Sequence, residues 1–222
     1  MKFRHEYKHC INNIDIYCLR TRLKTVMDFD KNCNDDCTYI VKSLYFDNVY
    51  DKALREKVDG VNRREKFRIR YYGTDTSFIR LEKKSKINGL CIKEGIRLTT
   101  KQCIDIINGN RDFMVESENE LLREFYGKMK YGLLRPKCIV AYTREAYVYP
   151  PGNVRVTIDT DVGVSYNTSG FLHPDLQFTR VSKGAILEIK WDEYLPQIIR
   201  DCVQLKTRKS SAFSKYSVSR IY

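Results

Sequence analysis

Apolar and polar residues alternate along eight segments of this chain, as they do in β-strands with one buried face. In the segment 184–191, for example, Glu188 and Lys190 lie two residues apart between apolar neighbours. Side chains two apart on a strand share a face, so each such strand combines an apolar face with a charged one. The other predicted strands are 2–11, 38–46, 63–73, 77–87, 89–98, 137–149 and 153–165.

Helix-capping and turn residues separate these strands. Asn12 or Asn13 begins a predicted helix that reaches to about Asp28, and a short helix ends at Gly60. Further helices are expected from Thr99 or Thr100 to the Gly109 region, from a capping box at 117–120 to about Lys130, and over 193–205. Asn88-Gly89 and Pro150-Pro151-Gly152 are predicted turns, and the tail from Lys206 is basic and rich in serine. This order predicts a single α+β domain over residues 1–222, with mostly antiparallel strands and peripheral helices.

The composition is that of a globular chain with a large excess of positive charge. Lys and Arg number 40 against 28 Asp and Glu, which gives a net charge of +12 and favours anionic partners. The eight cysteines show no disulfide framework and no zinc-site spacing, so we interpret them as reduced, mostly buried thiols of a cytoplasmic protein. Neither a signal peptide nor a transmembrane segment is predicted, although a membrane-bound partner and the oligomeric state stay open.

The charged strand faces are biased toward cations. One interpretation is a solvated outer sheet surface, which is common in antiparallel sheets. The other is a barrel whose polar face encloses a wet, cationic cavity suited to a polyphosphate and a metal ion. Single-stranded nucleic acid is disfavoured, because Phe67 and Tyr71 lie on the face opposite Arg68 and Arg70.

These residues resemble the VTC domain, the polyphosphate-polymerase branch of the triphosphate tunnel metalloenzymes. The resemblance spans nearly the whole chain and rests on the joint order of short segments. They include Arg4-His5-Glu6-Tyr7-Lys8, Ser43-Leu44-Tyr45-Phe46-Asp47, Phe67-Arg68-Ile69-Arg70-Tyr71-Tyr72-Gly73, Leu81-Glu82-Lys83-Lys84, Lys93-Glu94, Tyr142-Thr143-Arg144, the segment 154–159, Leu187-Glu188-Ile189-Lys190 and Ser211-Ala212-Phe213-Ser214-Lys215-Tyr216.

The resemblance implies an eight-stranded antiparallel β-barrel tunnel with helices packed on the outside. It implies transfer of the terminal phosphate of ATP onto a growing polyphosphate, aided by Mn²⁺ or Mg²⁺. Glu188 would be the main metal ligand, with Glu6 and Glu82 as further candidates, and Tyr142, Lys190 and Ser214 would contact substrate. The phosphate-binding cations implied by the resemblance are Lys8, Arg68, Arg70, Lys84, Lys93, Arg144, Arg155 and Lys215.

Two other functions stay open for such a tunnel. One is hydrolysis of tripolyphosphate or a nucleoside triphosphate, and the other is binding of polyphosphate without catalysis. The related cyclase and thiamine-triphosphatase branch usually begins Glu-x-Glu-x-Lys, whereas Arg4 stands at the first of these positions here. The smaller number of carboxylates weakens a two-metal hydrolase interpretation.

Overall fold

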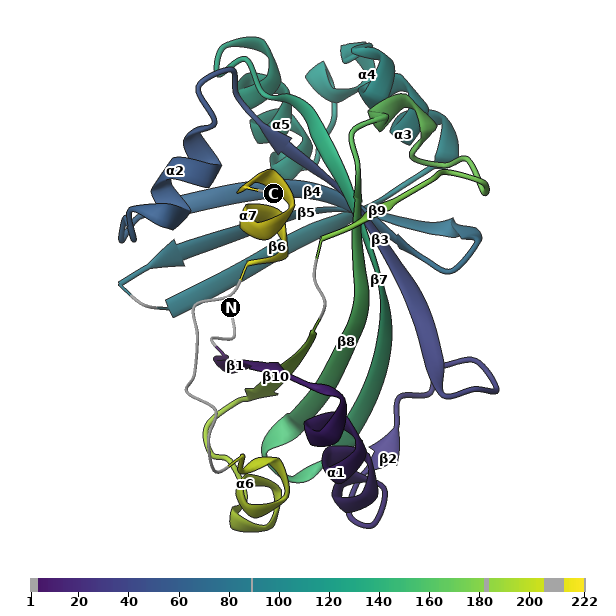
Figure 1. Cartoon of the computed structure of the whole chain (residues 1–222). Coiled ribbons are helices and arrows are strands. Elements are labelled where there is room, and N and C mark those ends of the chain that lie inside the picture. The colour runs from purple at the N-terminus through teal and green to yellow at the C-terminus, as the bar shows by residue number, and fades with distance from the viewer. Residues whose placement is uncertain (1–3, 89, 182–183, 206–213, 222) are drawn as a thin grey trace.

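A curled antiparallel sheet forms the centre of the computed structural model, which describes residues 4–88, 90–181, 184–205 and 214–221 (Figure 1). Its main path runs in the order β1-β10-β8-β7-β3-β4-β5-β6, and the short strands β2 and β9 add to β7 and β8. The strands are β1 (His5–Ile11), β2 (Asp28–Phe29), β3 (Thr38–Asp47), β4 (Arg64–Tyr72), β5 (Asp75–Ile87), β6 (Leu90–Leu98), β7 (Arg135–Tyr149), β8 (Val154–Ser165), β9 (Thr179–Arg180) and β10 (Ala185–Trp191).

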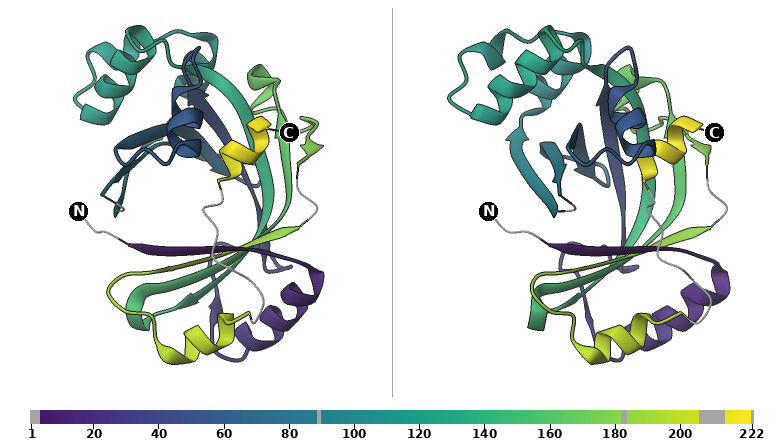
Figure 2. Two further views of the ribbon diagram at one scale, coloured as in Figure 1. Left: turned by 60° about the vertical axis from the view of Figure 1, so that its left-hand side comes forward. Right: turned by 90° about the vertical axis from the view of Figure 1, so that its left-hand side faces the viewer.

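The sheet curves into a half-barrel whose two edge strands are β1 and β6 (Figure 2). Every pairing along the path is antiparallel. The sequence prediction of an eight-stranded antiparallel α+β fold with outer helices is confirmed. Among the described residues, however, no backbone pairing joins β1 to β6, so the barrel has a seam. A side-chain ion pair bridges toward it: the Lys84 ammonium on β5 lies 3.1 Å from the Glu6 carboxylate on β1.

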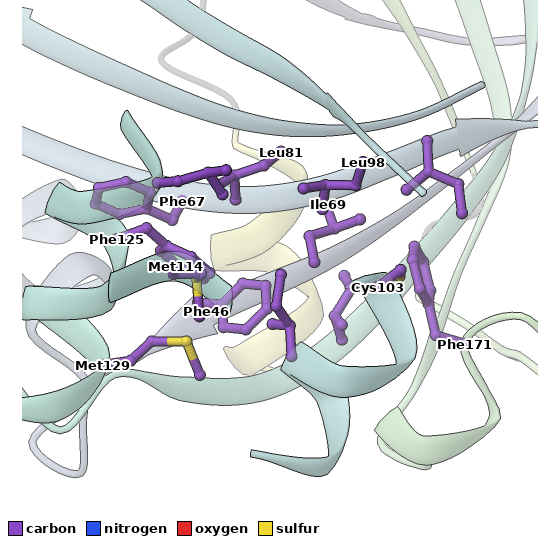
Figure 3. Packing of buried hydrophobic residues seen from close by; sticks show 14 of the residues in the cluster. Phe46, Phe67, Ile69, Leu81, Leu98, Cys103, Met114, Phe125, Met129 and Phe171 are labelled. Carbon is purple, nitrogen blue, oxygen red and sulfur yellow. The ribbon is translucent and has the colours of Figure 1, made fainter. Parts of the chain in front are cut away.

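Helices cover the convex face of the sheet in two places. The helices are α1 (Asn13–Leu23), α2 (Lys52–Val58), α3 (Thr100–Asn108), α4 (Asp112–Val115), α5 (Glu120–Lys130), α6 (Gln197–Val203) and α7 (Lys215–Ile221). One apolar cluster places Phe67 of β4 and Leu81 of β5 against Phe125 of α5 (Figure 3). A second packs β8 and β10 against α1 and α6. Each fully buried Leu, Ile or Phe side chain contributes about 1.5–3 kcal/mol, so this burial fixes which strand face turns inward.

The concave face is partly apolar and carries the C-terminal helix α7. Tyr216 of α7 is buried, with its ring centroid 5.1 Å from that of Tyr45 on β3, and its hydroxyl donates to Asp47 at 2.6 Å. Val140 and Val164, from β7 and β8, belong to the same cluster. This apolar part occupies one section of the concave face, and the charged side chains occupy the rest.

Several predicted boundaries were wrong. Helix α1 ends at Leu23, not near Asp28, because the chain then forms β2 against β7. Asn119 caps α5 by accepting from the amides of Leu121 and Leu122, so the capping box expected from Ser117 is absent. Helix α6 begins only at Gln197, after Pro196. Helices α4 and α7 were not predicted, since both are short and α7 lies in a stretch of mixed polarity.

The remaining sequence expectations have mixed outcomes. Asn88 adopts a positive φ of 49°, as the predicted β5–β6 turn requires, while Gly89 lies outside the described residues, as do parts of the first strand and of the basic tail. None of the eight cysteines is in a disulfide, but only Cys103 and Cys138 are buried and Cys10 is exposed, so the prediction of mostly buried thiols was wrong. None of the helices built by the described residues is long and apolar enough to span a bilayer.

Candidate functional site

Glu188 of β10 lies at the centre of a cluster of cations on the concave face. Its carboxylate is 3.2 Å from the Lys8 ammonium, 3.1 Å from the Lys190 ammonium and 3.5 Å from the Arg144 guanidinium. The neighbouring residues Leu187 and Ile189 point the other way, into the core under α1 and α6. Burial alone would raise the pKa of Glu188, but Lys190, Lys8 and Arg144 lower it well below its ordinary value. Glu188 is therefore ionised at neutral pH.

Glu6 stands beside Glu188 and shares a cation with it. The Lys8 ammonium contacts both carboxylates, and the Lys84 ammonium reaches Glu6 from β5. Burial and the Glu188 charge act to raise the pKa of Glu6, yet Lys8 and Lys84 bring it below its ordinary value. Burial lowers the pKa of Lys190 to about 8, although the two carboxylates oppose that shift. The group thus combines two close carboxylates with cations from four strands, β1, β5, β7 and β10.

A second group extends from Glu188 to α7. The Arg144 guanidinium forms a two-pronged contact with Asp159, at 2.6 and 2.7 Å, and the Lys215 ammonium lies 2.5 Å from the same carboxylate. Lys215 also lies 4.5 Å from the centroid of the Tyr142 ring. Burial favours protonation of Asp159, but Arg144 and Lys215 lower its pKa to about 2. Asp159 therefore holds two of the predicted phosphate-binding cations together.

Arg68, Arg70, Glu82 and Lys93 form the part of the site built on β4, β5 and β6. The Arg68 guanidinium donates to Glu82 at 2.7 Å, and the Lys93 ammonium lies 2.5 Å from the other oxygen of Glu82. Arg70 instead donates to two neutral oxygens, the Ser43 hydroxyl at 3.0 Å and the Tyr142 hydroxyl at 3.1 Å. Burial alone would raise the pKa of Glu82, but Arg68, Arg70 and Lys93 hold it far below its usual range. The Tyr142 contacts link this group to Lys215.

Two of the predicted residues stand in local structural roles. Arg155 donates to the Tyr39 hydroxyl at 2.8 Å and pairs with Asp30, in the loop after β2. Ser214 is buried, and its hydroxyl accepts from the Ser217 amide at 3.3 Å, in the first turn of α7. Both lie on the concave side, but among the described residues neither forms a hydrogen bond or ion pair with the Glu188 group.

The carboxylates fit a hard divalent cation that also binds phosphate. Across the described parts of the chain, no three His, Cys, Asp or Glu side chains converge on one point. Mg²⁺ and similar ions are commonly held by one or two carboxylates, with substrate phosphates and water completing the shell. Glu188 and Glu6, both in contact with Lys8, suit that arrangement. Glu82 has a different set of partners, Arg68 and Lys93, and is not brought into this pair.

Four contributors to the site were not among the residues predicted from the sequence. Asp159 lies in the segment 154–159, on the strand face opposite Ile158, but was not predicted to be a site residue. Tyr45 accepts from Arg68 at 3.3 Å, Ser43 accepts from Arg70, and Lys66 lies 5.7 Å from the Tyr45 ring centroid. Their side chains follow the same alternation as the predicted residues. The period-two position along the strand, and not the residue type, would therefore have identified them.

A model of the VTC domain matches residues 3–221, nearly the whole chain. The chain belongs to the VTC domain family. This family is related to polyphosphate polymerases and shares the tunnel-enzyme fold, so the membership supports a role in handling triphosphate or polyphosphate. A fold of this type also implies dependence on a divalent metal. No curated protein matches the chain.

Solved structures show the same fold at low sequence identity. The PH1012 protein from Pyrococcus horikoshii OT3 is 12% identical, with a TM-score of 0.52 over 98% of this chain and 99% of that one. A candidate adenylate cyclase from Bacillus halodurans is 11% identical, with a TM-score of 0.51 over 85% of this chain and 80% of that one. At these identities the likeness concerns the fold alone.

Proposed function

We propose that this VTC domain protein is a metal-dependent polyphosphate polymerase, which transfers the terminal phosphate of ATP onto a growing polyphosphate chain. The observation that carries the proposal is the cluster around Glu188, where an ionised carboxylate is surrounded by Lys8, Lys190 and Arg144 on a concave face. Such a face neutralises several phosphates at once and holds a carboxylate where a metal could join them.

The cations would orient and neutralise the phosphates. At about 4 Å and an effective dielectric near 20, each cation–phosphate charge pair interacts by roughly 4 kcal/mol before desolvation. Arg70 is already oriented by hydrogen bonds to two neutral hydroxyls, those of Ser43 and Tyr142, and neither hydroxyl neutralises its charge. It is therefore well placed to bind a phosphate group. The acceptor of the transferred phosphate, the end of a polyphosphate, is already an oxyanion. The proposed reaction therefore requires no strong general base from the protein.

The metal would be held by Glu188 and Glu6 together with phosphate oxygens. Its chemistry would be that of a Lewis acid, withdrawing charge from the transferred phosphate. Lys8 now links the two carboxylates, so its ammonium would move from a carboxylate to a phosphate oxygen when the ligand and metal bind. Lys8 would then orient the phosphate chain relative to the metal ligands.

Incubation of the protein with ATP and Mn²⁺ or Mg²⁺ tests the proposal. The expected products are ADP and long-chain polyphosphate, which is resolved on a gel. Glu188→Gln keeps the shape of the side chain but removes its charge, and polymer formation should fall at least about a hundredfold while the fold persists. Glu124→Gln is the matched control, because Glu124 pairs with Lys83 on the helix-covered side.

The product pattern separates the proposal from its alternatives. ADP with orthophosphate and no polymer would identify a hydrolase of the same fold. Tripolyphosphate binding without turnover, under either metal, would identify a polyanion-binding module. Equal loss of folding in Glu188→Gln and Arg70→Ala would contradict the site itself, since the two residues would then be structural.

A further inference from the structure

Three arginines from neighbouring strands form a row on the concave face. Arg70 of β4 lies directly opposite Arg80 of β5, and Arg80 lies opposite Arg97 of β6. Directly opposed residues of antiparallel strands point to the same side of the sheet. Because strands are about 4.8 Å apart, the row extends roughly 10 Å from Arg70 toward the β6 edge.

Arg80 and Arg97 have hydrogen-bond acceptors but no carboxylate partner. Arg97 donates through Nε and Nη2 to the Ser77 carbonyl, at 3.2 and 2.6 Å, and Arg80 donates through Nη2 to the Gly95 carbonyl at 3.3 Å. Among the ion pairs of the described residues, none includes either arginine. The Nε atom of Arg80 is shielded from solvent and has no acceptor. Arg68 and Arg144, by contrast, are each neutralised by a carboxylate.

The surroundings hold the two guanidinium groups in place. Both lie over the ring of Phe78, at 5.9 Å for Arg80 and 5.6 Å for Arg97, measured from the guanidinium carbon to the ring centroid. Gly95 leaves the space that the Arg80 side chain occupies, since a Cβ at position 95 would lie 3.2 Å from Arg80 Nη2. The ring and the missing side chain therefore position two like charges side by side, at an energetic cost that an anion would offset.

We propose that Arg80 and Arg97, braced by Phe78, form an anion subsite at the β6 edge that binds phosphate groups of a linear polyphosphate extending beyond Arg70. This inference rests on the proposed function and adds to it a preference for long chains. Guanidinium groups match phosphate oxygens well, because they present several N–H donors in a plane. A nucleobase is a poorer fit, since the arginines themselves lie over the Phe78 ring.

Competition binding with two ligands tests the subsite. Tripolyphosphate is short enough to contact the central cations alone, whereas long-chain polyphosphate would also reach the β6 edge. In the double variant Arg80→Gln/Arg97→Gln, the affinity for long-chain polyphosphate should fall about tenfold or more, and its salt dependence should become shallower. The affinity for tripolyphosphate should change by less than about twofold.

Two further variants keep the result interpretable. Arg22→Gln/Arg123→Gln removes the same charge from α1 and α5, where both arginines also donate to carbonyl oxygens, and should leave both affinities unchanged. Phe78→Leu keeps the charges but removes the ring, and should weaken long-chain binding selectively, although less than the double variant. Phe78 is 41% exposed, so this change leaves the core intact.

The outcomes separate failure of the subsite from failure of the proposed function. Equal effects on both ligands, or no effect on long chains, would overturn the subsite while leaving the proposed function standing. Wild-type protein that binds neither ligand would overturn both. A selective loss of single-stranded oligonucleotide binding, with polyphosphate binding unchanged, would assign the row of arginines to nucleic acid and overturn the inference.

Discussion

Replacing Asp159 with asparagine tests whether a buried carboxylate organises the cations of the site. The wild-type carboxylate is fully buried and contacts Arg144 through two oxygens and Lys215 through one. A pKa lowered from 3.8 to about 2 corresponds to about 2 kcal/mol of stabilisation from ionisation alone. The variant also removes this carboxylate from the buried Arg144, which keeps only its 3.5 Å contact with Glu188, and from the nearly buried Lys215, so the free energy of unfolding should fall by about 3–5 kcal/mol at pH 7.

Urea unfolding, followed by circular dichroism, measures this loss. Asp161→Asn is the matched control, because Asp161 lies on the same strand and its pair with Arg180 is exposed. The control should lose less than about 1 kcal/mol. The folded pKa of Asp159 is below the unfolded one, so its stabilisation is present above pH 3.8 and disappears as the pH falls to about 2. Asp159→Asn should therefore lose less stability over that acid range than the wild type does.

Tripolyphosphate provides a second measurement on the same variant. If Arg144 and Lys215 face the ligand, an added anion should restore part of the stability that the Asp159 carboxylate provided. The stabilisation by saturating tripolyphosphate should then be larger for Asp159→Asn than for the wild type. A loss no greater than that of Asp161→Asn, in the absence of ligand, would refute the organising role of Asp159.

Three other changes test separate parts of the structure. Burial and the charges of Lys84, Arg68 and Lys8 keep the pKa of Lys66 well below its ordinary value, although Glu6 opposes them. The unfolded chain therefore binds this proton more tightly than the folded protein does, so the wild-type free energy of unfolding should rise toward the alkaline range. Lys66→Met should flatten that rise and stabilise the protein at pH 7, as urea titrations at several pH values will show. Tyr142→Phe removes a 3.1 Å hydrogen bond from Arg70 and should lower the unfolding free energy by about 1 kcal/mol. Thr99→Ala removes the cap of α3 and should cost about 1 kcal/mol without changing tripolyphosphate affinity by calorimetry.

The strands were predictable because the alternation of apolar and polar residues agreed with the positions of the turn and capping residues between the segments. Alternation placed Ile158 and Leu187 on one face and Asp159 and Glu188 on the other, and the structure buries the first pair under α1 and α6. The same pattern favoured enclosure of the charged face, since the apolar alternates needed cover, but it was also compatible with a solvated outer surface. Strand pairing order and the open seam did not follow, because period-two alternation carries no information on which edges meet.

The parts that sequence reasoning missed depend on contacts between distant segments. Tyr216 is buried only because α7 returns to the concave face, where its hydroxyl meets Asp47, 169 residues away in the chain. Asp159 acquires its importance from Arg144 on the neighbouring strand and Lys215 on α7. The capping error at Ser117 was local: Asn119, two residues later, caps the helix instead by accepting from the amides of Leu121 and Leu122. No single segment shows such contacts.

The seam between β1 and β6 changes how the concave face can respond to a ligand. A barrel closed by backbone hydrogen bonds has a fixed circumference, and widening it would break several of those bonds. Here the bridge toward the edge is the Lys84–Glu6 ion pair, which connects two partly exposed side chains. Such a pair is weakened by salt and can re-form within nanoseconds. We therefore expect the separation of β1 from β5 and β6 to depend on side-chain electrostatics, so that ionic strength and bound anions change it while the sheet stays intact.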